Sequence, residues 1–384
     1  MTCNRTQDLY DICRINDPTI FVSSESTFLV NDPNSLNYQI EKVRPYARKP
    51  ERYTMYNIRE VTLKLGPLNT STCAVHHTAP ALVFSAGGGY TGNFFHDFND
   101  VFIPLFITAN SVFSNQDFVL VVSQLKDWWV EKYKGLLHSF SKHQIIDSDK
   151  DNSSHCFPGA SIGLIKHGFM TINPKLIQTS KTLVDFHTFL ATTYNKQILV
   201  PRIVNKPRLV LMSRNKTVGR AMLNEPEVER IAENVGFQVI LFEPTRKTSL
   251  KEAFALVSSS HAMLGVHGAG LTHAMFLRPG SVFVQIIPIG AEDVSEYCYG
   301  IPARVLGLDY MEYKIKTYES SLVEKYGNDS KILNDPLALQ RGGWPPHIMD
   351  IYLKHQDVRL DPKRLRRCLK TAYHKAKVFM DKNG

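Results

Sequence analysis

Two groups of residues have the types and spacing that chemistry needs, and the first is a glycine turn between an apolar strand and a helix. The turn comprises residues 267–270, after an apolar run at 262–266 and before a helix expected at 271–277. A helix start leaves N–H groups unpaired and partially positive, and glycines allow an anion to approach them closely. The turn is therefore a candidate diphosphate site. A tight turn that only satisfies backbone geometry is the alternative.

The second group lies on a helix expected after the glycines at 87–89. Advancing about 100° per residue along residues 93–106 separates an aromatic and aliphatic face from a polar face. The polar face gathers Asn93, His96, Asp97 and Asp100, and His96 and Asp100 stack as an i, i+4 pair. A histidine with two carboxylates could form a general-base site. The alternative is a set of acids at the start of a helix that face solvent.

Two other motifs are weaker. The dinucleotide pattern G-x-G-x-x-G fails at the glycine turn because His273 takes the place of its last glycine, which argues against a nicotinamide enzyme. Asp147 and Asp149 form a D-x-D pair after a short strand and could hold a divalent metal on a nucleotide diphosphate. Because they lie in a run of Asp, Ser, Lys and Asn, a solvated loop is the favoured interpretation.

The elements around the glycine turn predict a parallel, doubly wound sheet. Strands are expected at 208–212, 237–243, 262–266 and 281–287, and helices at 225–235, 250–258 and 271–277. Ligands of such sheets bind outside the carboxyl ends of the strands. Those ends present Arg214, Glu243 and the turn, with Arg220 within reach, so phosphate donors and a possible ribose acceptor converge there.

The first half of the chain alternates strand and helix less regularly. Residues 1–55 are predicted to be an irregular N-terminal segment, and strands follow at 61–65, 81–84, 118–122 and 144–146. The expected domains are therefore 56–200 for the acceptor and base, 201–345 for the nucleotide, and a C-terminal helical segment at 346–384. A length of 384 residues fits two domains better than one.

Composition narrows the partners and the compartment. The net charge of +9 favours anionic partners, but the cations are scattered with few aromatics among them, so nucleic acid is excluded. No apolar run is long enough to span a membrane, and any anchor would lie outside this sequence. Six cysteines point to a secretory lumen, with Cys3 and Cys13 close enough to bridge. Five N-x-S/T sequons suggest a glycoprotein: Asn4, Asn69, Asn152, Asn215 and Asn328.

The sequence resembles glycosyltransferase family 61, particularly its plant xylan-modifying members. The resemblance is carried by residues 92–100, by 213–214 with Arg220 and 224–225, and by 265–272. It implies an α/β chain with the GT-B fold, two facing Rossmann-like domains with parallel sheets. It also implies a Golgi-lumen type II membrane protein and an inverting transfer of a sugar from a UDP-sugar onto xylan.

The family pattern gives the candidate residues their expected roles. Asp97 is the expected base, with His96 as its competitor and Asp100 in support. The UDP-sugar is expected at Gly92, Asn93, Arg214, Arg220, Asn224, Glu243, His267, Gly268, Ala269, Gly270, Leu271 and Thr272. With a helix start and an arginine to neutralise the leaving diphosphate, no metal or cofactor is expected.

The predicted activity is transfer of a pentose onto the xylan backbone of the plant cell wall. UDP-xylose and UDP-arabinofuranose are equally compatible donors. Two alternatives stay open: a metal-dependent glycosyltransferase that uses Asp147 and Asp149 on another acceptor, and a catalytically silent glycan-binding protein.

Overall fold

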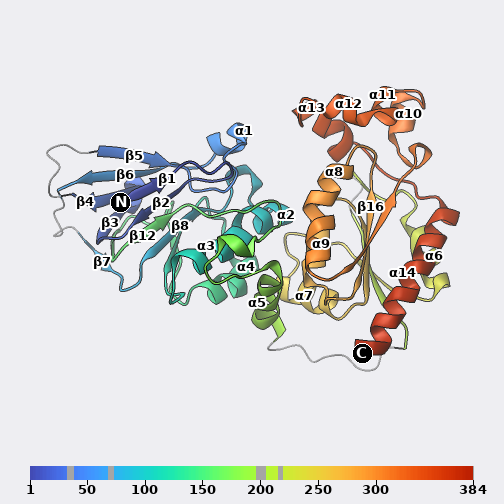
Figure 1. The fold of residues 1–384 in the computed structure, drawn as a ribbon, viewed down its shortest axis with the longest axis horizontal. Helices are drawn as coiled ribbons and strands as arrows, with labels where there is room; N and C mark the ends of the chain where they lie inside the picture. The colour runs from blue at the N-terminus through green and yellow to red at the C-terminus, as the bar shows by residue number, and fades with distance from the viewer. Residues whose placement is uncertain (33–38, 68–72, 196–204, 215–218, 384) are drawn as a thin grey trace. The chain divides into compact units, whose positions relative to one another are not determined.

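The computed structural model describes residues 1–32, 39–67, 73–195, 205–214 and 219–383. The chain divides into two compact units, Met1–Phe189 (unit 1) and Leu190–Gly384 (unit 2), whose ribbons are drawn in Figure 1. This boundary lies close to the one expected at residue 200. Residues 196–204, around that expected boundary, lie outside the described residues.

Unit 1 contains a mixed sheet with a parallel centre. Its strand order is β1-β2-β12-β8-β9-β10, and the strands from β12 to β10 run parallel. The apolar runs that predicted strands here form its buried centre, with β8 buried at every residue. The strands are β1 (Thr2–Asn4), β2 (Ile12–Ile15), β8 (Ala81–Ser85), β9 (Val119–Ser123), β10 (Ile146–Asp147) and β12 (Ala160–Ile162).

A second sheet of unit 1 has the order β5-β6-β4-β3-β11-β7 and is mainly antiparallel. Its apolar faces pack in one core with the first sheet, where Phe21, Phe28 and Leu63 are fully buried. The strands are β3 (Thr19–Val22), β4 (Thr27–Asn31), β5 (Gln39–Val43), β6 (Val61–Gly66), β7 (Val75–His76) and β11 (Ser154–Phe157).

The prediction of an irregular segment at 1–55 is therefore wrong. This region supplies β1 to β5, the 3-10 turn η1 (Ser23–Glu25) and the short helix α1 (Arg52–Tyr56). Its strands are three to five residues long and pair with strands far along the chain, such as β3 with β11 and β2 with β12. A local hydrophobic period cannot show such pairings.

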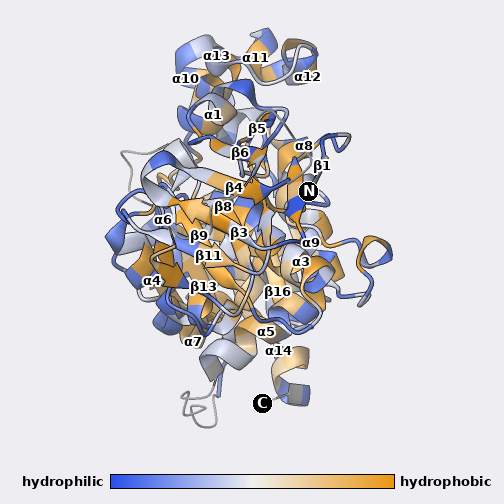
Figure 2. Ribbon diagram, turned by 90° about the vertical axis from the view of Figure 1, so that its left-hand side faces the viewer, coloured by the Kyte–Doolittle hydropathy of each residue, from blue (hydrophilic) through white to orange (hydrophobic). Residues whose placement is uncertain are grey.

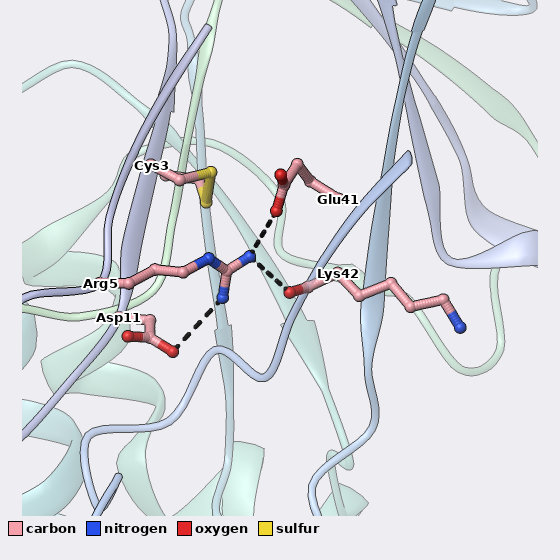
Figure 3. The surroundings of a disulfide bond; sticks show 6 residues. Cys3, Arg5, Asp11, Glu41 and Lys42 are labelled. Carbon is pink, nitrogen blue, oxygen red and sulfur yellow. Dashed lines mark hydrogen bonds and ion pairs between the residues drawn. A yellow bond between two sulfur atoms is a disulfide. The ribbon is translucent and has the colours of Figure 1, made fainter. Parts of the chain in front are cut away.

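A disulfide and an ion-pair cluster stabilise the arrangement of the first strands (Figure 3). Cys3 and Cys13 are bridged, as the sequence predicted, and Cys73 is bridged to Cys156. Arg5 pairs with Asp11 at 3.5 Å and with Glu41 at 2.9 Å, and donates to the Lys42 carbonyl at 2.7 Å.

Among the sequons inside the described residues, Asn4, Asn152 and Asn328 are exposed, whereas Asn69 and Asn215 lie outside the description.

Apart from η1 and α1, the helices of unit 1 follow the glycine turn after β8. A nearly continuous helix runs through α2 (Phe94–His96), the π-helical η4 (Asp97–Phe102) and α3 (Ile103–Val112). The others are η3 (Gly88–Tyr90), α4 (Asp127–Phe140), η5 (Pro174–Leu176) and α5 (Leu183–Asn195).

Unit 2 contains the predicted parallel sheet, with strand order β14-β13-β15-β16-β17. Its strands are β13 (Arg208–Met212), β14 (Gln238–Phe242), β15 (Ala262–Val266), β16 (Val282–Ile287) and β17 (Asp309–Lys314). The helices between them include α6 (Glu225–Val235), α7 (Leu250–Ser258), the 3-10 helix η7 (Ala269–Phe276), α8 (Glu292–Ser295), the π-helical η8 (Glu296–Gly300) and α9 (Ile301–Val305).

The sequence suggested a separate C-terminal segment at 346–384. In the structure this region is part of unit 2. Leu365 and Leu369 of α14 (Pro362–Asn383) are fully buried in the core that also holds α6. Between β17 and α14 lie η9 (Thr317–Glu319), α10 (Leu322–Tyr326), α11 (Lys331–Asn334), α12 (Pro336–Gln340), α13 (Pro346–Met349) and η10 (Asp350–Lys354).

In Figure 2 the strands are mostly orange, in keeping with their burial. Within the described ranges, no helix has the length and apolar character needed to cross a bilayer.

Candidate functional site

The candidate base helix is fixed at its start by a glycine turn and a side-chain cap. Gly87 and Gly88 have φ of +111° and +54°, which glycine adopts without strain. Asn93 accepts a hydrogen bond from the Phe95 amide at 3.2 Å and caps α2. The π-helical turn that follows carries Asp97 and Asp100. Such turns are rare and often mark functional sites.

Asp100 is the centre of a buried polar cluster in unit 1. Its side chain has no exposed surface and accepts hydrogen bonds from Tyr46 (3.2 Å), Arg48 (3.1 Å), His96 (2.7 Å), Asn99 (2.5 Å) and Lys166 (2.5 Å). Burial alone would raise the pKa of Asp100, but Lys166, His96 and Arg48 outweigh it and hold the pKa well below its usual range. Asp100 is therefore ionised. The alternative of solvent-facing acids on this helix is wrong.

His96 lies between Asp100 and the ring of Tyr90. Its Nδ1 is 2.7 Å from Asp100 Oδ2, which confirms the predicted i, i+4 pair, and its ring stacks on Tyr90 with centroids 3.9 Å apart. Because Asp100 is an ionised acceptor, we assign the proton to Nδ1, which leaves the lone pair on Nε2. Burial lowers the pKa of His96, so the imidazole is neutral at pH 7. Nε2 can then accept a proton from a substrate hydroxyl.

Asp97 is placed differently from the expectation. It is 1% exposed and accepts hydrogen bonds from the Gly92 amide at 3.0 Å, Trp129 Nε1 at 3.0 Å and Tyr133 Oη at 2.7 Å. Burial raises the pKa of Asp97 to about 6, although these hydrogen bonds lower it. A general base must reach the proton that it removes. The enclosed carboxylate does not, so the geometry disfavours Asp97 as the base and gives it a structural role.

Gly92 also serves the structure of unit 1. Its φ is +88°, and a Cβ at this position would lie 2.1 Å from the Trp128 ring. Its amide closes the turn onto Asp97. Gly92 was expected to bind the donor, and its observed contacts instead join the turn to α4. Asn93 is exposed beside it, and nothing in its contacts tests a role in binding.

Sequence reasoning missed four members of the Asp100 cluster: Tyr46, Arg48, Asn99 and Lys166. Tyr46 and Arg48 lie in the region that was predicted to be irregular. Lys166 follows an apolar stretch after β12. A lone cation beside an apolar run was the available signal, since a charge there needs a buried partner. The partner itself could be known only from the fold.

In unit 2, the glycine turn leads directly into the 3-10 helix η7. This helix begins at Ala269 rather than at Leu271, and the Leu271 amide donates to the Gly268 carbonyl at 2.9 Å. The amides of Ala269 and Gly270 donate to no backbone carbonyl of the described residues. The amides of Ala269 and Gly270 are therefore the candidates for binding an anion. Leu271 and Thr272, expected to contact the donor, are each 1% exposed.

Arg214 and Arg220 form a cationic pair at this turn. The Arg214 guanidinium covers Gly268, where a Cβ would lie 2.5 Å from its Nη1. No carboxylate of the described residues pairs with either arginine. Burial and the charge of Arg214 lower the pKa of Arg220 to about 10, and Arg220 has a left-handed φ of +57°. Both arginines are partly buried and form no ion pair among the described residues, although the charge of Asp357 acts on Arg214. With Arg220 on a left-handed backbone, they are candidates for an anion site.

His267, the first residue of the turn, is a neutral side chain that can donate a hydrogen bond. Its Nδ1 is 3.0 Å from Gln285 Nε2 and 3.1 Å from Ser295 Oγ. Both groups can donate to Nδ1, so we assign the ring proton to Nε2. Burial, together with Arg220 and Arg214, lowers the pKa of His267 well below its ordinary value. His267 therefore donates a hydrogen bond without adding charge.

Asn224 and Glu243 were also predicted to bind the UDP-sugar, and neither belongs to the cationic pair. Asn224 donates to Glu227 at 2.9 Å and to the Leu360 carbonyl at 3.0 Å, and accepts from the Leu360 amide at 3.0 Å. Its side chain is thus hydrogen-bonded within unit 2, and its role in UDP-sugar binding stays a prediction. Glu243 is exposed just after β14, at the predicted carboxyl end. Its role as a ribose acceptor stays a prediction.

The D-x-D pair has protein partners. Asp149 pairs with Arg59 at 2.5 Å and accepts from the Gln124 amide at 2.5 Å, and Asp147 accepts from the Asp149 amide at 3.1 Å. Among the described residues, the three-residue cluster of metal-ligand types is Cys73, His76 and Cys156, whose cysteines are disulfide-bonded. Neither aspartate belongs to it.

Comparisons with known proteins agree with this distribution of candidate residues over both units. Residues 92–284 match the model of the family Glycosyltransferase 61, a range that includes His96, Asp100, Arg214 and Gly268. The chain is 38% identical to the xylan glycosyltransferase MUCI21 of Arabidopsis thaliana over an alignment that covers 98% of this chain and 80% of the relative.

Two relatives from Oryza sativa subsp. japonica are nearly as similar. The beta-1,2-xylosyltransferase XYXT1 is 36% identical, with 87% of this chain and 72% of the relative aligned. The alpha-1,3-arabinosyltransferase XAT3 is 34% identical, with 95% of this chain and 63% of the relative aligned. The family match, the extent of these alignments and the α/β fold with parallel sheets agree. The chain belongs to the glycosyltransferase 61 family.

Proposed function

We propose that this chain transfers a pentose from a UDP-sugar onto the xylan backbone as a side chain, with inversion at the anomeric carbon. The names of the relatives support both the acceptor and the class of sugar, because they include a xylan glycosyltransferase, a xylosyltransferase and an arabinosyltransferase. Since those names differ in the pentose, UDP-xylose and UDP-arabinofuranose are both candidate donors.

The observation that carries the proposal is the cationic pair over Gly268. Arg214 and Arg220 are partly buried cations that form no ion pair with a carboxylate of the described residues, and the amides of Ala269 and Gly270 start a helix beside Gly268. His267 adds a neutral N–H donor. A diphosphate offers the charge and the acceptor oxygens that these groups require. We therefore assign the UDP moiety to this turn.

The His96 dyad supplies the base in this proposal. The acceptor hydroxyl gives its proton to His96 Nε2 while its oxygen forms a bond to the anomeric carbon. The bond from that carbon to the phosphate oxygen breaks on the opposite face, and the arginines stabilise the departing UDP. Asp100 stabilises the imidazolium that forms, and Arg48 and Lys166 hold Asp100 in place. The parallel strands of each unit and the division of base and donor residues between them support the GT-B arrangement.

We propose that no metal or other cofactor takes part. The two guanidinium groups provide the positive charge that a divalent cation would otherwise supply to the leaving diphosphate. The protein partners of Asp147 and Asp149 support this choice over the metal-dependent alternative. The disulfides and the exposed sequons support a Golgi-lumen glycoprotein.

A donor screen tests the proposal. The purified chain is incubated with individual UDP-sugars and xylo-oligosaccharides, with and without EDTA, and the products are identified by mass and by NMR of the new linkage. We expect one pentose to be added, in inverted configuration, equally well with EDTA. Loss of transfer with EDTA would support the metal-dependent alternative. Xylan binding without release of UDP from any donor would support a silent glycan-binding protein.

A further inference from the structure

The short helix α1 of unit 1 exposes two aromatic rings. Tyr53 is 86% exposed and Tyr56 is 80% exposed, the highest values among the large hydrophobic residues of the described chain. They are three positions apart, which places them as neighbours on one face of a helix, roughly 5 to 6 Å apart at Cβ. No described residue forms a ring contact or a side-chain hydrogen bond with either ring. A pair of rings so exposed is a candidate binding surface.

Hydrogen bonds connect this helix to the proposed base site. Glu51, which precedes α1, is paired with Arg48, and Arg48 donates to Asp100 at 3.1 Å. Thr54 of the helix donates to Glu51 at 3.0 Å. Arg48 also lies over the ring of Tyr90, which stacks on His96. The two exposed rings are therefore held in a fixed relation to His96, the residue to which the acceptor must come.

The chemistry of the surface fits a neutral sugar chain. A pyranose ring has a face of C–H bonds and an edge of hydroxyls, and tyrosine offers a flat apolar face with a hydroxyl at its tip. The charge of Glu51 is used by Arg48, and Arg52 is the one cation of α1. Nothing here concentrates charge as a polyanion site would.

We infer that Tyr53 and Tyr56 bind the acceptor xylan by stacking on successive sugar rings beside the residue that is transferred onto. This inference rests on the proposed function, since it names the subsite for its acceptor. These two rings, the Tyr53/Tyr56 platform, orient a long xylan chain whose reacting hydroxyl lies at His96. Short acceptors that do not reach α1 do not bind more tightly because of the platform.

The test compares the double variant Tyr53→Ala/Tyr56→Ala with Tyr53→Phe/Tyr56→Phe, which keeps both rings. Ile40→Ala is the matched control, since Ile40 is another apolar residue of unit 1 and is 59% exposed. We expect the KM for xylan to rise about tenfold in the alanine variant, with the KM for the donor and the rate of UDP-sugar hydrolysis unchanged. The phenylalanine variant should stay within about threefold of the wild type.

An unchanged KM for xylan in the alanine variant would overturn the inference. Binding of the protein to xylan without turnover, measured by retardation in a gel that contains xylan, tests this inference separately from the proposed function. If the wild type binds xylan but transfers nothing, the proposed function fails, and loss of retardation in the alanine variant still supports the platform. Equal retardation of all variants refutes it. A monomer–dimer change in the alanine variant, with xylan binding unaltered, would identify the surface as a contact between copies and also overturn it.

Discussion

Replacing Asp100 by Asn perturbs both the stability of unit 1 and the proposed base. The carboxylate has no exposed surface and lies between Arg48 and Lys166, whose side chains are 9% and 5% exposed. A neutral amide removes the carboxylate that these two cations share and leaves a buried positive charge less well compensated. Breaking a buried pair in this way costs about 3 to 5 kcal/mol. For a unit of this size, Tm should fall by roughly 6 to 20 °C.

The same variant should lose transfer activity. Without an ionised acceptor, Nδ1 of His96 is no longer held as the protonated nitrogen, and the imidazolium formed by proton transfer is not stabilised. General-base catalysis contributes about 100-fold or more, so kcat should fall by at least that factor at a temperature where the variant is folded. UDP affinity should not change, because the cationic pair belongs to unit 2.

Thermal unfolding and initial rates measure both effects, with Asp117→Asn as the control. Asp117 pairs with Lys142 and His143 in unit 1, but its side chain is 34% exposed. Its replacement should therefore lower Tm far less than that of Asp100. Adding Lys166→Met to Asp100→Asn should restore part of the Tm but not the rate. Wild-type Tm and wild-type kcat in Asp100→Asn would refute the reasoning about the cluster.

Three further predictions follow from the two candidate sites. His96→Gln should lower kcat at least 100-fold with unchanged UDP affinity, and Asp97→Asn should retain transfer; the reverse outcome in kinetic assays would restore Asp97 as the base. Because burial raises the pKa of Asp97 to about 6, the native state binds more protons than the unfolded state between about pH 4 and 6. Urea unfolding should show wild-type stability falling by about 3 kcal/mol relative to Asp97→Asn as pH rises through this window, and parallel pH profiles would contradict it. Gly268→Ala should weaken UDP binding about tenfold, because the added Cβ displaces Arg214, and undiminished affinity in calorimetry would remove Arg214 from the site.

Four of the five strands in the sheet of unit 2 could be predicted from the sequence because each is a short apolar run between helices. The fifth, β17, carries Asp, Glu and Lys and was not among the expected strands. The i, i+4 contact of His96 with Asp100 was predictable for the same reason, since helix geometry alone places these side chains together. The turn at Gly268 was recognised from its glycines, although η7 starts two residues earlier than expected.

The interior of unit 1 could not be predicted in this way. The helical period correctly separated the polar residues of 93–106 from the apolar ones, but it cannot show that Asp97 and Asp100 are buried. Asp100 is enclosed by Tyr46, Arg48 and Lys166, and Asp97 by Trp129 and Tyr133. All of these residues come from distant segments. The same limit applies to the strands of residues 1–55, whose partners are remote in sequence.

Calorimetric titration of UDP in the presence of EDTA tests the central claim most directly, namely that Arg214 and Arg220 hold the diphosphate. Hydrogen bonds to charged groups contribute about 1.5 to 3 kcal/mol each, so Arg214→Ala/Arg220→Ala should bind UDP at least 100-fold more weakly than the wild type. Arg366→Ala, an exposed arginine of α14, should bind as the wild type does. Wild-type affinity in the double variant, or UDP binding that requires a metal, would contradict the account.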